Sequence, residues 1–72
     1  MNYDPNYLDP TILKWTTERI KEKFELSDPE SQTYAEKALL GIEGHGGNNK
    51  DKEEIEEVLD VVVATWIKIS KD

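Results

Sequence analysis

The sequence predicts a small all-α domain, on three observations. Residues 55–69 repeat their apolar side chains at intervals of three and four, which is the pattern of a helix with one buried face. Two proline-containing capping sequences stand further upstream, and four glycines gather between positions 41 and 47. A chain of 72 residues forms one domain, which we expect to span residues 1–72. Its expected parts are an N-terminal arm (1–8), three helices (about 9–25, 29–40 and 51–70) and a flexible Gly-rich loop (41–50).

The first helix is expected to begin at Asp9 and Pro10, because an aspartate caps free backbone amides and proline suits the first helical position. Its buried stripe is expected to hold Leu13, Ile20 and Phe24, with Thr17 beside them.

Three residues of this helix fall on roughly the opposite side when each residue turns by about 100°: Ile12, Trp15 and Arg19. Trp and Arg are over-represented among interface hot spots, so these three are candidates for binding a partner. The alternative is that the arm or another element covers Trp15, which then belongs to the core.

The second helix has two candidate starts. Ser27 and Glu30 have the spacing of a capping box, or Asp28 caps the helix with Pro29 at its first position. The expected buried stripe is Ser31, Tyr34, Ala35, Ala38 and Leu39, with Ile42 as an optional last member. Gly41 is expected to end the helix. The short connection makes the first two helices antiparallel neighbours.

The third helix carries the widest apolar surface. A step of about 100° places six residues near one centre: Ile55, Val58, Leu59, Val62, Trp66 and Ile69. Val63 and Ile67 fall on one flank and Val61 on the other. This arc is wider than one neighbouring helix needs, so Val61, Val63 and Ile67 are predicted to bind a partner. Acidic residues at the start and lysines at the end suit the helix dipole.

A strand is the competing interpretation of the same stretch, because β-branched residues alternate from Val61 to Ile69. We reject it because the preceding EEIEEVLD is strongly helical and no second strand is available for pairing.

The chain has 16 acidic and 9 basic residues, a net charge of −7 and a sequence pI near 4.6. This balance argues against direct binding to nucleic acid or to an anionic membrane, both of which need a basic surface. The N-terminus has no secretory signal, and the longest uninterrupted apolar run is too short to span a bilayer. We expect a soluble cytoplasmic protein.

No stretch of the sequence predicts a cofactor, a metal site or a catalytic centre. The glycine-rich loop lacks a preceding strand and both phosphate-binding signatures. His45 is the sole histidine and the chain has no cysteine, whereas a zinc site needs three or four nitrogen or sulfur ligands. Nothing singles out a carboxylate pair for acid–base work. The expectation is a protein that is not an enzyme.

The leading expectation is a protein–protein interaction or regulatory module that binds a protein partner or forms a homodimer through its surplus apolar surface. Acidic rims would set partner choice and association rate. The alternative is an acidic inhibitor, for example phage-encoded, that imitates nucleic-acid charge. Its acidic face would be Glu53, Glu56, Glu57 and Asp60. It requires these residues to form one continuous surface with the acidic residues of the first helix. A solvated helix face and a structural subunit of a larger assembly are further alternatives.

Overall fold

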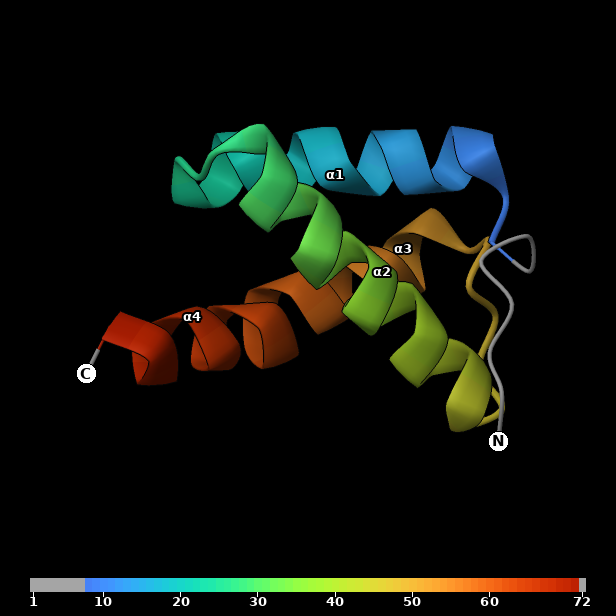
Figure 1. The fold of residues 1–72 in the computed structure, drawn as a ribbon. Coiled ribbons are helices and arrows are strands. Elements are labelled where there is room, and N and C mark those ends of the chain that lie inside the picture. The colour runs from blue at the N-terminus through green and yellow to red at the C-terminus, as the bar shows by residue number, and fades with distance from the viewer. Residues whose placement is uncertain (1–7, 72) are drawn as a thin grey trace.

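The computed structural model describes residues 8–71, with side chains for residues 8–70, and this part of the chain is helical without strands (Figure 1). Its elements are α1 (Pro10–Phe24), α2 (Asp28–Gly44), α3 (Lys52–Val58), the π-helical turn η2 (Leu59–Val63) and α4 (Ala64–Lys71). The last three form one continuous rod, called the third rod below. The predicted all-α class is confirmed. The predicted arm lies outside the described residues, except for Leu8, which is buried.

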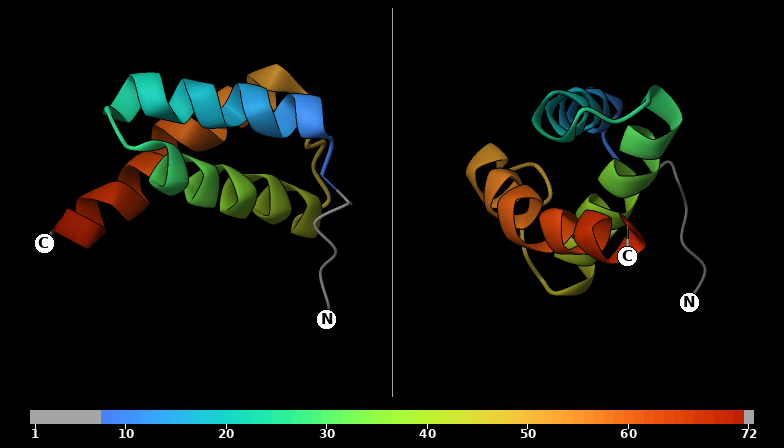
Figure 2. Two further views of the ribbon diagram at one scale, coloured as in Figure 1. Left: turned by 45° about the horizontal axis from the view of Figure 1, so that its top comes forward. Right: turned by 90° about the vertical axis from the view of Figure 1, so that its left-hand side faces the viewer.

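α1 and α2 are antiparallel neighbours, as their short connection predicts (Figures 1 and 2). α2 runs back from the end of α1 in roughly the opposite direction, and the third rod passes across α2 (Figures 1 and 2). The C-terminal end of α4 extends beyond the contact between α1 and α2 (Figure 2). The core therefore lies where α1, α2 and the third rod meet, and the C-terminal end of α4 projects beyond it.

Side-chain caps fix where the helices begin. The carboxylate of Asp9 accepts a first-turn N–H of α1 at 2.9 Å, and that of Asp51 does the same for α3 at 3.0 Å. For α2 the observed cap is Ser27 rather than Asp28. Ser27 Oγ accepts the Glu30 N–H at 3.5 Å and donates to the Glu30 carboxylate at 3.1 Å.

The predicted end of α2 at residue 40 is wrong, because the helix continues through Gly41 to Gly44. Ile42 stands three and four residues after Leu39 and Ala38 and is buried with them. Burying an isoleucine side chain is worth roughly 1.5–3 kcal/mol. A glycine inside a helix costs about 0.8–1.0 kcal/mol, so burial outweighs the cost. The connecting loop is residues 45–51 rather than 41–50.

The core joins all three rods. Its buried apolar members are Leu8, Ile20, Ala35, Ala38, Leu39, Ile42, Ile55, Leu59, Val63 and Ile67. The expected stripe of α2 is buried, apart from a half-buried Tyr34. In α1 the fully buried residues are Ile20 and Thr16, whereas the expected Leu13 and Phe24 are partly buried.

Thr16 is buried because α1 packs between two neighbours, α2 and the third rod, rather than against one. Its hydroxyl donates to the carbonyl of Ile12 at 2.7 Å, which satisfies the polar group inside the core.

The π turn η2 decides which residues of the third rod face the core. The Ala64 N–H donates to the carbonyl of Leu59, an i→i+5 bond that widens the turn. Each residue in such a turn advances by less than the α-helical step of about 100°. The four-residue series Ile55, Leu59, Val63 and Ile67 therefore stays on one face and is buried.

The predicted centre of this face was wrong for the same reason. Val62 and Ile69, expected in the core, are 36% and 67% exposed. Val63 and Ile67, expected to bind a partner, are 0% and 6% exposed. These two residues stabilise the domain itself and are not available as a binding surface.

Candidate interaction surface

Three large apolar side chains remain exposed among the described residues: Val61 at 66%, Val62 at 36% and Ile69 at 67%. All three belong to the third rod. Val58 and Trp66, which are half-buried, stand four residues before and after Val62 on the same side of the rod. We call Val58, Val62, Trp66 and Ile69 the apolar strip, and Val61 lies beside it.

Two open hollows adjoin this strip. The first, of about 240 Å³, lies between α2 and the third rod and is lined by Ala38, Gly41, Ile42, His45, Gly47, Glu54, Val58, Val62 and Trp66. The second, of about 420 Å³, is lined by Tyr34, Lys37, Trp66, Ile69 and Ser70. Trp66 separates the two, and its ring stacks on that of Tyr34 at 6.4 Å between centroids and 19° between planes.

The first hollow has small residues on its α2 side. Ala38 has a single methyl group, and a Cβ added at Gly41 would meet nothing within 4 Å. The glycine that fails to end α2 therefore leaves open space beside the apolar strip. The first hollow thus has small residues of α2 on one side and Val58 and Val62 of the third rod on the other.

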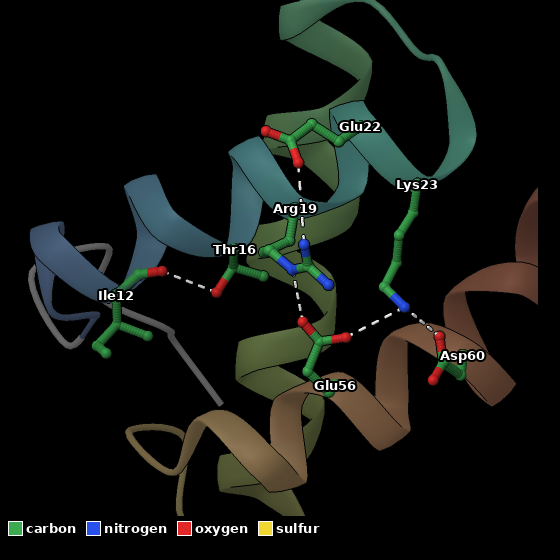
Figure 3. A network of polar contacts seen from close by, with 7 residues as sticks. All are labelled: Ile12, Thr16, Arg19, Glu22, Lys23, Glu56 and Asp60. Carbon is green, nitrogen blue, oxygen red and sulfur yellow. Dashed lines mark hydrogen bonds and ion pairs between the residues drawn. The ribbon is translucent and has the colours of Figure 1, made fainter.

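The opposite side of the third rod is occupied by ion pairs with α1 (Figure 3). The Arg19 guanidinium donates to one oxygen of Glu56, and Lys23 Nζ lies 3.1 Å from the other. Lys23 also pairs with Asp60, and Arg19 lies 3.8 Å from Glu22. The hydrogen bond from Arg19 holds the pKa of Glu56 below its usual range. The pKa of Lys23 is raised, first by Asp60 and then by Glu56.

This network divides the acidic face predicted from the sequence. Glu56 and Asp60 form ion pairs with Arg19 and Lys23 of α1, whereas Glu53 and Glu57 are exposed. Two basic side chains of α1 lie between the acids of the third rod and those of α1. The continuous acidic surface that charge mimicry requires is interrupted at this point.

The predicted partner residues of α1 lie toward this helix contact. Ile12 and Trp15 are partly buried and pack against the core, and Arg19 bonds to Glu56. Lys52 Nζ lies 5.2 Å from the centroid of the Trp15 ring, at cation–π distance. The covered-Trp15 alternative from the sequence is therefore the better description. Its neighbour among the described residues is Lys52 of the third rod.

Of the six predicted partner residues, Val61 is the one that remains largely exposed. Sequence reasoning assigned Val62, Trp66 and Ile69 to the core and so missed them as surface. No spacing in the sequence distinguishes them, because Val58, Val62 and Trp66 recur every four residues just as the buried series Ile55, Leu59, Val63 and Ile67 does. The π turn η2 decides which of the two series faces the core.

The described part of the chain gathers no group of three or more His, Asp or Glu side chains that could hold a metal ion. Between residues 8 and 71, no helix combines the length and apolar character needed to cross a membrane. Comparison of the chain with protein-family models, curated proteins and solved structures finds no match in any of the three.

Proposed function

We propose that the protein is a small non-enzymatic interaction module that binds another protein chain through the apolar strip and the two hollows beside it. The observation that carries this proposal is the exposure of Ile69 and Val62 on either side of Trp66. A chain of 72 residues can bury only a small apolar core. Burying a side chain such as Ile69 in a complex is worth roughly 1.5–3 kcal/mol.

The charges beside the strip would select the partner. Glu54 lines the first hollow near the N-terminal end of the strip, and Lys37 lines the second hollow near its C-terminal end. A bound helix whose own charges run in the opposite order is favoured, and one with the same order is repelled. Charge mimicry of nucleic acid has weaker support, because Arg19 and Lys23 neutralise two of the four acids on which it depends.

Site-specific photo-crosslinking tests the proposal. A photoreactive amino acid replaces Val61, which is exposed beside the strip, and in a control protein it replaces Glu18, which is exposed on α1. After irradiation in extract of the native source, position 61 is expected to give crosslinks to a protein chain, whether another protein or a second copy. Adding Ile69→Asp to the position-61 protein is expected to reduce them. Equal yields from positions 61 and 18, or no crosslinks from 61, would overturn the proposal.

A further inference from the structure

We infer that the third rod has a second register, without the π turn, in which α4 is rotated and the apolar strip is buried in the protein's own core. This inference rests on the proposed function, because it concerns access to the same binding surface. We call the register in the structure the π register and the one without the wide turn the regular register. A partner can reach the strip in the π register, whereas the regular register hides it.

The regular register follows from the apolar pattern of the rod. When every residue advances by about 100°, the residues that follow η2 are rotated by roughly one such step from their place in the π register. The buried face of the preceding part is marked by Ile55 and by Leu59, about 40° further round. In the regular register three residues of the strip lie within about 40° of Ile55: Val62, Trp66 and Ile69. They therefore face the core.

The other side of the rod becomes polar in the same register. Four residues lie between about 140° and 220° from Ile55: Glu57, Asp60, Ala64 and Lys68. None of the four has a large apolar side chain, so this side suits water. Val61 stays outside the core face, at about 240°. The sequence thus fits the regular register as well, and the wide turn is what leaves Val62 and Ile69 exposed.

The exchange replaces two core residues of the rod and leaves its other core residues in place. Val63 turns away from the core and Val62, a side chain of the same size, turns toward it. Ile67 is the buried residue among the described side chains of α4, and Trp66 replaces it. The ring of Trp66 then leaves Tyr34, on which it stacks in the π register. Because the C-terminal end of α4 projects beyond the contact between α1 and α2, much of the helix turns outside the core (Figure 2).

Binding and register are linked. A partner that covers the strip binds only the π register, so it draws the rod into that register. Without a partner, the regular register removes Val62, Trp66 and Ile69 from water. The π turn is then the element that changes between the two registers, in keeping with the frequent occurrence of π turns at functional sites.

Thiol labelling tests the exchange, since the chain contains no cysteine. The variant Ile67→Cys places a thiol where the wild-type side chain is 6% exposed in the π register. In the regular register position 67 turns to about 120°, between Glu56 and Asp60. The side chains of these two residues are 28% and 60% exposed. A brief pulse of maleimide under native conditions therefore detects the regular register.

The matched control combines Ile67→Cys with deletion of Val61. The shortened rod is a regular α-helix that keeps position 67 within about 40° of Ile55 and Leu59, so it has no second register. Labelling is expected to be at least about tenfold faster in the protein that keeps Val61. Leu59→Cys, at a position on the core face in both registers, should label at the same slow rate with and without the deletion.

Fraying of α4 would speed labelling at position 67 equally in both proteins. Equal rates with and without Val61 would therefore overturn the inference.

The outcomes distinguish this inference from the proposed function. Crosslinks from position 61 together with equal labelling rates would refute the exchange and leave the interaction module standing. Faster labelling that depends on Val61, without crosslinks from position 61, would refute the proposed function and with it the control of binding.

Discussion

The π turn η2 acts as a one-residue insertion in an otherwise regular helix, so deleting Val61 should be tolerated. Val61 lies inside η2 and is 66% exposed. In an uninterrupted α-helix of the present length, the buried series Ile55, Leu59, Val63 and Ile67 would spread over about 120°. After the deletion the same four residues would lie within about 60° of arc on a regular α-helix. The shortened rod would thus keep its core face without a π turn.

The expected change in the free energy of unfolding is small. The deletion removes one exposed valine and no core contact, so unfolding should change by no more than about 1 kcal/mol. A chain of 72 residues has a total stability of roughly 4–11 kcal/mol, from about 0.05–0.15 kcal/mol per residue. Urea unfolding followed by circular dichroism resolves a change of this size.

Deletion of Glu18 is the matched control, since it removes one exposed residue from the regular helix α1. Because α1 contains no π turn, the deletion rotates the two halves of α1 by about 100° relative to each other. Thr16 and Ile20, which are both fully buried, stand on either side of the deletion and cannot both keep their places. We expect a loss of about 3 kcal/mol or more. If the Val61 deletion lowers stability as much as the Glu18 deletion, then η2 is not the one-residue insertion that keeps Ile55, Leu59, Val63 and Ile67 on one face.

Three further substitutions probe the network and the glycines. Glu56→Gln should lower the free energy of unfolding at pH 7 by about 1 kcal/mol, because it loses two basic partners. Because the pKa of Glu56 is lower in the folded state, its carboxylate stabilises the fold at pH values above the unfolded-state pKa, and this stabilisation is lost as pH falls below about 4.5. The Gln variant should therefore lose less stability than the wild type on acidification, measured by urea unfolding at a series of pH values. Gly47→Ala should cost roughly 1–3 kcal/mol, because the new Cβ would lie 2.5 Å from Glu54 Oε1 and 2.9 Å from Ile42 Cγ2. Gly41→Ala, with open space around it, should instead stabilise by about 0.5–1 kcal/mol. Equal urea midpoints for the two alanine variants would contradict this reading of the loop.

The helix starts were predictable because capping is local chemistry. Asp9, Ser27 and Asp51 each precede a helical run, and each accepts the first-turn N–H that its position in the sequence implies. The ends were less predictable. Gly41 has the residue type of a helix end, yet burial of the following Ile42 carries α2 onward.

The exposed apolar strip could not be predicted from periodicity, because a constant turn per residue was assumed for the whole third rod. Because of the single π turn η2, Val63 is buried where Val62 was expected in the core, and Val62 and Ile69 are exposed. Likewise, the isolated pattern of α1 leaves Trp15 and Arg19 opposite the core, whereas two packing neighbours give them a covered place.

The sequence by itself determined the helical class, the number of rods, the cap of the first helix and the excess of acid over base, because these depend on neighbours along the chain. It left more than one candidate cap for the second helix. Tertiary packing decided which apolar residues are buried in the core and which remain exposed. It also decided that Glu56 and Asp60 pair with α1 instead of facing solvent. These choices depend on the twist of the third rod and on contacts between residues 37 positions apart, such as Arg19 with Glu56. No local pattern records either of them.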